Sequence, residues 1–309
     1  MKKLEQNYIL NHLTITKYVK KRMIPTNFKY IDSSEYDDES EVSSEEKEFD
    51  IDIAMNEAYS KNKDKILAES IRSVANGIFA YYNSLNILVG NQGRGKTHIM
   101  LRDIIQISRL KDCNFHLIVY ISKNGSINDS TFEAQQELIQ LPIQVISDSN
   151  AEKYLKELDL YKELFDKYCN TPKITIDNDK LNKMFEFLHV NKLNKPNQPL
   201  NTIILCEDFV KSKLIKSAYF TNYITQLRHK HSIVYINIQF FKSISTDYKN
   251  NTTTFFIFSG YSRQKLQYIY QQVSLPIMFD ELWRNYVKMK NHDFILVNVR
   301  ENTIKFIRV

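Results

Sequence analysis

Eight consecutive residues in the first third of the chain have the types and spacing of a phosphate-binding loop. Residues 90–97 read Gly-Asn-Gln-Gly-Arg-Gly-Lys-Thr and hold three of the chain's six glycines. Glycines let the backbone fold tightly around phosphate groups, so that its N–H groups point inward. In such a loop Lys96 reaches the β- and γ-phosphates, and Thr97 places its hydroxyl on Mg²⁺. The spacing therefore predicts a nucleotide-binding site.

The residues on either side of this loop favour the same prediction. A largely apolar run, Leu85 to Val89, precedes the loop, and a helical pattern from His98 follows it. The following helix would point its positive amino-terminal end at a bound anion. A solvated turn is the competing interpretation, and the strand–loop–helix context argues against it. The expected nucleotide-binding residues are Gly90, Asn91, Gln92, Gly93, Arg94, Gly95, Lys96, Thr97 and His98.

Two adjacent carboxylates follow a second apolar run. This run, Ile203 to Cys206, ends directly before Glu207 and Asp208. Of two such carboxylates, the first would support Mg²⁺ together with Thr97, and the second would polarise the attacking water. An ordinary acidic turn is the competing interpretation, but the upstream phosphate loop favours catalysis. We therefore expect Glu207 at the metal and Asp208 at the water.

Two other polar residues are candidates for the catalytic site. The next apolar run ends at Gln239, and an amide at a strand end can sense the γ-phosphate or orient water. Its alternative role is to anchor a loop. Arg228 precedes that run, and in ring ATPases an arginine can neutralise charge that develops in the neighbouring subunit's site. Arg263 is the second candidate for this role. A surface salt bridge or a DNA phosphate contact is the alternative for both arginines.

Apolar runs and helical patterns alternate along the chain from about residue 51. This alternation predicts an α/β fold with a mostly parallel sheet, flanked by helices and binding ligands at the carboxyl ends of its strands. The charged helical segment 150–190 predicts a lid or an insertion, and 294–298 with 304–308 predicts an edge hairpin. The other expected strands are 85–89, 115–121, 143–146, 202–206, 233–237 and 254–258, and the other expected helices are 63–82, 98–110, 218–230 and 263–273.

The charge of the chain is distributed unevenly. Residues 32–50 carry ten acidic side chains and one lysine, a net charge of −9, which leaves +15 for the rest of a chain whose total is +6. Such an acidic, serine-rich segment predicts a disordered linker. It would separate a basic arm, residues 1–31, from an ATPase domain at 51–309. The basic remainder suits a polyanion such as nucleic acid, with solvated lysines as the alternative.

Composition limits the compartment in which the protein works. No apolar run approaches the ~20 residues that span a bilayer, so we expect no membrane span. The three cysteines, Cys113, Cys169 and Cys206, are scattered and odd in number. This pattern indicates a reducing compartment and argues against a disulfide framework or a zinc cluster.

The order of these motifs resembles that of the poxvirus-type genome-packaging ATPases of large DNA viruses and virophages, within the FtsK/HerA superfamily. The resemblance covers roughly residues 80–275. It includes the loop, IILCED, a helix ending LRHKH, a strand ending NIQ, and FSGYSRQKLQYIYQQ. It implies a RecA/FtsK/HerA-like P-loop NTPase fold and an ATP- and Mg²⁺-dependent translocase of double-stranded DNA. Such a motor forms a homo-oligomeric ring, packages the genome with capsid or portal-region proteins, and works in the infected host cell or the virion.

The resemblance also implies roles for individual residues. Lys96 and Thr97 would serve the nucleotide and Mg²⁺, Gln239 would be the sensor, and Arg228 would act on the neighbouring subunit. One departure concerns the first carboxylate, which is usually aspartate in this family and is Glu207 in this chain. The resemblance therefore leaves open which of Glu207 and Asp208 holds the metal and which polarises the water.

Three other functions fit parts of the sequence. A nucleoside or nucleotide kinase also begins with a phosphate loop, but no arginine-rich lid is evident, and the adjacent carboxylates and Gln239 argue against it. A helicase or recombination motor also moves nucleic acid through a ring, and the sequence does not separate it from a packaging motor. A nucleotide-gated scaffold would tolerate loss of catalytic groups, whereas Lys96, Thr97 and Asp208 are intact.

Overall fold

The computed structural model describes residues 79–109, 115–127, 129–170, 177–190, 199–207, 209, 212–273 and 275–309. The basic arm 1–31, the acidic segment 32–50 and Asp208 lie outside the described residues, as do residues 63–78 of the first expected helix. The last four residues of that expected helix, 79–82, are not helical, so this part of the prediction is wrong. Phe79 N donates instead to the buried carboxylate of Asp103 at 2.6 Å, which leads the chain directly toward the first strand.

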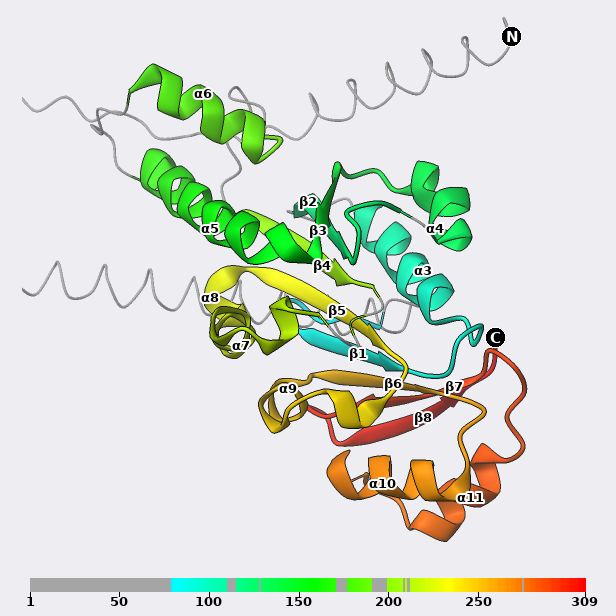
Figure 1. Cartoon of the computed structure of the whole chain (residues 1–309). Coiled ribbons are helices and arrows are strands. Elements are labelled where there is room, and N and C mark those ends of the chain that lie inside the picture. The colour runs from blue at the N-terminus through cyan, green and yellow to red at the C-terminus, as the bar shows by residue number, and fades with distance from the viewer. Residues whose placement is uncertain are drawn as a thin grey trace, which may run out of the picture. The chain divides into compact units, whose positions relative to one another are not determined.

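An eight-stranded sheet forms the centre of the described part (Figure 1). In spatial order its strands are β3 (Ile143–Ser147), β2 (Phe115–Ser122), β4 (Asn201–Cys206), β5 (Ser232–Ile238), β1 (Leu85–Val89), β6 (Thr254–Phe258), β7 (Phe294–Asn298) and β8 (Thr303–Ile307). The first six strands in this order are parallel, β7 is antiparallel to β6, and β8 is antiparallel to β7. The predicted mostly parallel α/β sheet and its edge hairpin are confirmed.

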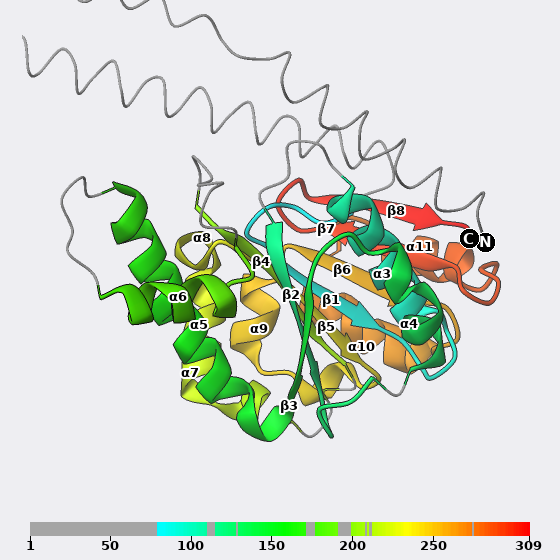
Figure 2. The same cartoon turned by 90° about the horizontal axis from the view of Figure 1, so that it is seen from above.

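Helices cover both faces of the sheet, and apolar side chains form a separate core on each face. One face is covered by α3 (Lys96–Ser108) and α4 (Ser130–Gln135). The helices that cover the other face are α5 (Asp148–Asn170), α6 (Asn178–Phe187), α7 (Ala218–Thr225), α8 (Leu227–Lys230), α9 (Thr246–Asn251), α10 (Arg263–Val273) and α11 (Phe279–Tyr286). Figure 2 shows the sheet between α5 and α7 on one side and α3 and α4 on the other.

Helix α5 belongs to the segment for which the sequence predicts a lid or an insertion. Its residues Ala151, Leu155 and Leu158 are completely buried in the core on one face of the sheet. Apolar residues at this spacing lie on a single face of a helix, so α5 packs on the sheet along its length. Since α5 contributes to the core, it forms part of the layer that supports the strands.

The position of β5 determines which loops come together. It lies between β1 and β4, with Ile238 opposite Val89 and Ile236 opposite Cys206. The carboxyl ends of parallel strands meet at one edge of a sheet. The loop after β1, Glu207 after β4, and Gln239 after β5 therefore lie at the same edge.

Asp103 fixes the direction of α3. Its carboxylate accepts hydrogen bonds from Phe79 N at 2.6 Å and from the Tyr235 hydroxyl at 2.8 Å. Burial raises the pKa of Asp103 to about 7, while these hydrogen bonds lower it. The contacts join α3 to β5 and to the chain segment that enters β1.

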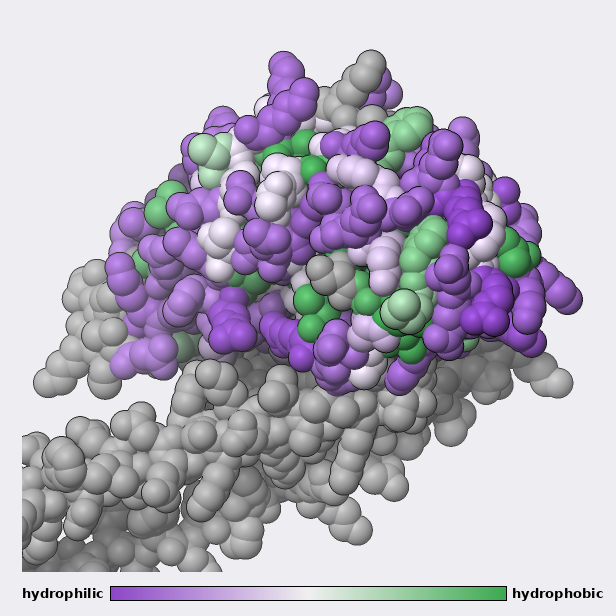
Figure 3. Space-filling view, turned by 90° about the horizontal axis from the view of Figure 1, so that it is seen from below, coloured by the Kyte–Doolittle hydropathy of each residue, from purple (hydrophilic) through white to green (hydrophobic). Residues whose placement is uncertain are grey.

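The outer surface is mainly polar where α10 and α11 lie. Figure 3 views the molecule from below, onto the side on which these helices lie in Figure 1, and shows hydrophilic side chains with small separate apolar patches. Among the described residues, no helix has the length and apolar character needed to cross a bilayer.

Candidate functional site

The loop after β1 has the backbone shape expected of a phosphate cradle. Gly93 and Gly95 have φ angles of +70° and +87°, in the left-handed region that favours glycine. Gly95 is also the residue directly before α3, and α3 begins at Lys96. Successive backbone N–H groups in such a turn form an anion-binding concavity in front of the helix.

Lys96 lies over this loop. Its Nζ donates hydrogen bonds to the carbonyl oxygens of Gly90 at 2.8 Å and Asn91 at 3.0 Å. Both acceptors belong to the loop itself, so the ammonium group is held at the mouth of the cradle. A cation in this position is placed to contact phosphate oxygens.

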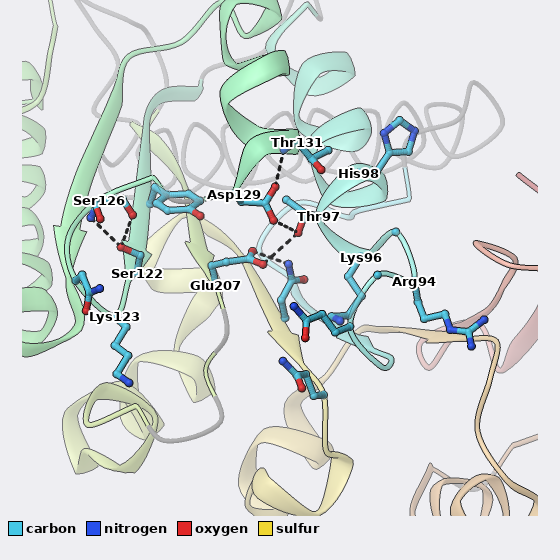
Figure 4. A pocket seen from close by; sticks show the side chains of 17 residues that line it. Arg94, Lys96, Thr97, His98, Ser122, Lys123, Ser126, Asp129, Thr131 and Glu207 are labelled. Carbon is cyan, nitrogen blue, oxygen red and sulfur yellow. Dashed lines mark hydrogen bonds between the residues drawn. The ribbon is translucent and has the colours of Figure 1, made fainter.

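Three oxygen-bearing side chains from three elements converge beside Lys96 (Figure 4). Thr97 Oγ1, in the first turn of α3, lies 3.1 Å from Oε1 of Glu207 and 3.2 Å from Oδ2 of Asp129. Glu207 follows β4 directly, and Asp129 immediately precedes α4. Thr97 and Glu207, the two residues expected at the metal, lie within hydrogen-bond distance of each other, and the structure adds a second carboxylate to the pair.

Two amide side chains from β5 complete this edge of the sheet. Asn237 Nδ2 donates to Oε2 of Glu207 at 2.7 Å. Asn237 is 1% exposed, and its Oδ1 is buried without a hydrogen-bond partner in the described part of the chain. Gln239, two residues later, lines the same cavity as Asn237.

The electrostatic environment of Glu207 is unusual for a carboxylate. The pKa of Glu207 is raised to about 7, mainly by burial and also by the charge of Asp129. Hydrogen bonds from Asn237 and Thr97, and the charge of Lys96, act in the opposite direction. A bound cation would favour the ionised form of this carboxylate.

These side chains border a cavity of about 440 Å³. It is lined by residues of the loop after β1 and the first turn of α3, of the end of β2 through the first turn of α4, and of the ends of β4 and β5: Gln92, Gly93, Arg94, Gly95, Lys96, Thr97, His98, Tyr120, Ser122, Lys123, Asn124, Ser126, Asp129, Thr131, Glu207, Asn237 and Gln239. A volume of this size is within the range of small-molecule and cofactor sites.

The turns after β6 and before β7 hold the loop from outside. Asn91 Nδ2 donates to the carbonyl of Gly260 at 3.1 Å, and Arg94 Nη1 donates to Oδ1 of Asn291 at 2.8 Å. In Figure 4 the Arg94 side chain points away from Glu207. The guanidinium therefore positions the loop and does not reach the converged carboxylates.

The structure brings most of the expected site residues together. Of the nine expected nucleotide-binding residues, 92–98 line the cavity, and Gly90 and Asn91 provide carbonyl oxygens to Lys96. Glu207 and Gln239 also line the cavity. Asp208 lies outside the described residues, so its place in the site stays a prediction.

The two candidate arginines do not line this cavity. Arg228 is in α8, directly before the amino end of β5, at the edge of the sheet opposite Gln239. Arg263 begins α10 and pairs with Asp280 at 2.7 Å. Neither arginine completes the site within one chain, and a role in a neighbouring subunit stays a prediction.

Two residues of the site, Asp129 and Asn237, were missing from the sequence-based set. Asp129 precedes Ser-Thr-Phe-Glu, and an aspartate directly before such a segment is a helix-start pattern that was a usable signal. Asn237 lies two residues before Gln239. Its side chain therefore points to the same face of the sheet, because side chains alternate along a strand. Only Gln239 of this pair is among the residues expected from the sequence.

Comparisons with known proteins return solved structures. No protein-family model matches the chain, and no curated protein matches it. Among solved structures, the DNA-packaging ATPase B204 from Sulfolobus Turreted Icosahedral Virus is similar at 12% identity and a TM-score of 0.45, over 74% of this chain and 98% of that chain. B204 from Sulfolobus turreted icosahedral virus 2, in complex with ATP-gammaS, is similar at 13% identity and a TM-score of 0.43, over 73% and 96%.

A third structure comes from another group of ATPases. EssC (ATPases 2 and 3) from Geobacillus thermodenitrificans is similar at 12% identity and a TM-score of 0.45, over 72% of this chain and 39% of that chain. Similarity at this level assigns no role to an individual residue.

Proposed function

We propose that this protein is an ATP-hydrolysing motor of the viral genome-packaging type, which moves double-stranded DNA. One observation carries the proposal: Lys96 and Thr97 after β1 meet Glu207 after β4 at the edge of a cavity. A phosphate cradle, a cation at its mouth and an acidic group beside it are the parts that phosphoryl transfer to water requires.

The loop and the start of α3 would bind the triphosphate. The backbone N–H groups of the turn around Gly93 and Gly95 would donate to phosphate oxygens. Lys96 would exchange its two carbonyl acceptors for the β- and γ-phosphates. Because the cavity extends from the loop toward Lys123 and Ser126, it leaves room for the rest of the nucleotide.

The donor set at Thr97 fits Mg²⁺. Magnesium prefers oxygen ligands and is usually held by one or two carboxylates together with substrate phosphates. In the described part of the chain, no group of three or more His, Cys, Asp or Glu side chains is arranged to hold a metal. Protein side chains there do not form a complete metal site by themselves. Thr97 and Glu207 would hold Mg²⁺, which when bound would neutralise charge on the β- and γ-phosphate oxygens.

Hydrolysis needs a group that takes a proton from water. We assign this role to Asp208, because Glu207 already faces the Thr97 hydroxyl. As the water oxygen bonds to the γ-phosphorus, its proton passes to a carboxylate and the bond to the β-phosphate oxygen breaks, which releases ADP and inorganic phosphate. Gln239, at the end of β5, would orient the water or sense the γ-phosphate.

A basic and aromatic surface follows Gln239 along the chain, and we propose it as a DNA contact. Phe240 is 53% exposed, Lys242 Nζ lies 4.8 Å from the ring centroid of Tyr268, and Lys249 Nζ lies 5.0 Å from that of Phe241. Lysines that contact DNA neutralise its phosphates and release the counterions that were bound to them. This position would connect DNA contact to the nucleotide through β5.

A test of the DNA contact replaces Lys242 and Lys249 with alanine. The double variant should lose stimulation by DNA and keep its basal ATP turnover, because neither lysine lines the cavity. Alanine at the exposed Lys153 and Lys167 of α5 is the matched control. Stimulation equal to that of the unmodified protein would exclude this surface.

We also propose a homo-oligomeric ring in which Arg228 reaches the neighbouring subunit's γ-phosphate. The position of Arg228 at the opposite edge from its own cavity is consistent with a role between subunits. Packaging further implies capsid or portal-region partners and a location in the infected host cell or the virion. The ring, the partners and the location all depend on the proposed motor function, so evidence against that function would also exclude them.

The experiment that tests the motor function is steady-state ATP hydrolysis with and without long double-stranded DNA, beside Lys96→Ala. We expect DNA to stimulate ATP turnover by the unmodified protein, and we expect Lys96→Ala to show no turnover. Turnover that ignores DNA would support the nucleoside or nucleotide kinase, and a small phosphate acceptor would then be sought. Absence of turnover with intact nucleotide binding would support a nucleotide-gated scaffold.

A further inference from the structure

The two carboxylate oxygens of Asp129 have different surroundings. Oδ1 accepts hydrogen bonds from the backbone N–H groups of Thr131 at 2.9 Å and Phe132 at 3.0 Å, and so caps α4. Oδ2 faces the other way and lies 3.2 Å from Thr97 Oγ1. The helix cap therefore uses one oxygen and leaves the second directed at the Thr97 hydroxyl (Figure 4).

When Glu207 is ionised, the group around Thr97 contains more acceptors than protons. Thr97 Oγ1 carries one proton, yet it lies within 3.2 Å of oxygens from both Asp129 and Glu207. The other oxygen of Glu207 already accepts from Asn237 Nδ2. A hydroxyl between two carboxylates is an arrangement that a cation would stabilise, because the cation would satisfy the lone pairs that the single proton leaves over.

A second observation at this place also suggests a ligand. Asn237 is 1% exposed, and its Oδ1 is buried and has no hydrogen-bond partner among the described residues. Buried polar atoms without a partner are rare in native proteins and commonly indicate an ion or a water. Asn237 contacts Glu207 directly, so the unpartnered atom belongs to the same group of side chains.

We propose that Asp129 is the second carboxylate of the divalent-cation site and holds Mg²⁺ through Oδ2, together with Thr97 and Glu207. The inference rests on the proposed function, because the nucleotide phosphates provide the remaining ligands. Two carboxylates, one hydroxyl and phosphate oxygens match the donor set that Mg²⁺ uses in proteins. Asp129 thus ties the start of α4 to the metal as well as to the fold.

The alternative is that Asp129 acts only as the cap of α4. Asparagine and serine are as good as aspartate at this helix position, so Asp129→Asn and Asp129→Ser keep a capping oxygen while they remove the carboxylate. Asp177→Asn is the matched control, because Asp177 caps α6 through a side-chain oxygen and does not line the cavity. Asp129→Glu retains the charge.

The test measures binding of Mn²⁺, as a probe for Mg²⁺, to the full chain in the presence of ADP, by electron paramagnetic resonance titration. Asp129→Asn and Asp129→Ser should weaken Mn²⁺ binding by ~10–100-fold, while ADP binding in EDTA and the thermal unfolding midpoint stay close to those of the unmodified protein. Asp129→Glu should recover part of the Mn²⁺ affinity, and Asp177→Asn should change none of these quantities.

Two outcomes would overturn the inference, and they differ in what else they exclude. If the unmodified protein binds Mn²⁺ with ADP and the Asn and Ser variants bind it equally well, Asp129 is only a helix cap and the proposed function stands. If the unmodified protein binds no Mn²⁺ in the presence of ADP, both the Asp129 assignment and the proposed function are wrong.

Discussion

Buried polar groups lie at both ends of the parallel strands, at the amino-terminal ends (the amino edge) and at the carboxyl-terminal ends (the carboxyl edge). At one end the buried charged group has a full set of hydrogen-bond partners, and at the other it does not. At the amino edge, Lys162 of α5 donates to Thr202 Oγ1 and to the carbonyl oxygens of Lys230 and His231. An ammonium group has three donors, so three acceptors satisfy it. We call this group the amino-edge cluster; it also includes Tyr223 and Ser232, whose hydroxyl oxygens lie 2.7 Å apart.

At the carboxyl edge the balance is different. Thr97, Asp129 and Glu207 place acceptors together with too few protons, and Asn237 Oδ1 has no partner in the described part of the chain. This edge borders the cavity, whereas no residue of the amino-edge cluster lines it. A buried charged group whose hydrogen-bond partners are all protein groups holds secondary-structure elements together. A buried charged group that lacks some of its hydrogen-bond partners is available to a ligand. This difference separates a structural network from a functional one within a single sheet.

The largest expected effect comes from removing the cation of the carboxyl edge. Lys96→Ala should lower ATP turnover by on the order of 1000-fold, because the ammonium charge that would stabilise the transferred phosphoryl group is lost. Its free energy of unfolding should change little, since the hydrogen bonds that Lys96 Nζ donates to Gly90 and Asn91 stay within its own loop. Phosphate release under steady-state conditions measures the effect, with the exposed Lys153→Ala as control. Turnover above a tenth of the original value would remove Lys96 from the site.

The second prediction concerns the pH dependence of stability at Glu207. The folded state raises the pKa of this carboxyl from 4.5 to about 7, so between these values the folded protein binds more protons than the unfolded chain. The contribution of Glu207 to the stability of the unmodified protein therefore falls as pH rises from 4.5 to 7. Glutamine does not ionise, so Glu207→Gln does not lose stability in this way. The free energy of unfolding of the variant, relative to that of the unmodified protein, should therefore rise by on the order of 2–3 kcal/mol between pH 4.5 and 7.

Chemical denaturation in EDTA at several pH values, without nucleotide, measures this difference. Asp103, whose pKa is also raised to about 7, is present in both proteins, so its contribution cancels. A stability difference that does not change between pH 4.5 and 7 would show that Glu207 is ionised normally in the folded protein.

The third prediction tests the amino-edge cluster. Lys162→Met should destabilise the protein by about 1–3 kcal/mol at pH 9, because it removes the hydrogen bonds between the buried amino group and its acceptors on Thr202, Lys230 and His231. Burial lowers the pKa of Lys162 from 10.5 to about 7, so the unfolded chain binds more protons than the folded protein between these values. The contribution of Lys162 to stability therefore rises with pH from 7 toward 10.5, and the deficit of the variant should be smaller at pH 7 than at pH 9.

Denaturation at pH 7 and pH 9, beside Lys153→Met, provides the measurement. ATP turnover of the folded variant should remain within about 2-fold of the original, because a change of that size is below 0.5 kcal/mol. A large loss of turnover without a loss of stability would show that the amino edge takes part in catalysis and would break the comparison between the edges.

The smallest effect is expected at Arg228. Arg228→Ala should leave nucleotide affinity of the dilute protein within about 2-fold, since the side chain lies at the edge of the sheet opposite the cavity. If it serves a neighbouring subunit, turnover of the assembled protein should fall, and mixing with Lys96→Ala should restore some activity in mixed rings. Fluorescent-nucleotide titration and mixed-subunit turnover measure these quantities. Weaker nucleotide binding by the dilute variant would place Arg228 in its own site.

Much of the fold and part of the site followed from local patterns in the sequence. The strands at 85–89 and 254–258 and the helix at 263–273 have the predicted bounds, because their apolar periodicity and flanking residues are local properties. The helix expected over 218–230 is interrupted at Gln226, between α7 and α8. The phosphate loop was predictable because eight contiguous residues build it.

The sequence by itself determined the loop at 90–97, the acidic strand end at Glu207 and the α/β class, since each depends on residues that are close along the chain. Only the tertiary structure decided that Asp129 and Asn237 join Thr97 and Glu207, since these residues come from different elements and meet only after β5 lies between β1 and β4. It also decided that Arg228 lies roughly 20 Å from the cavity edge, at the far end of a seven-residue strand. Strand order depends on packing over the whole sheet, and no local pattern of residues encodes it.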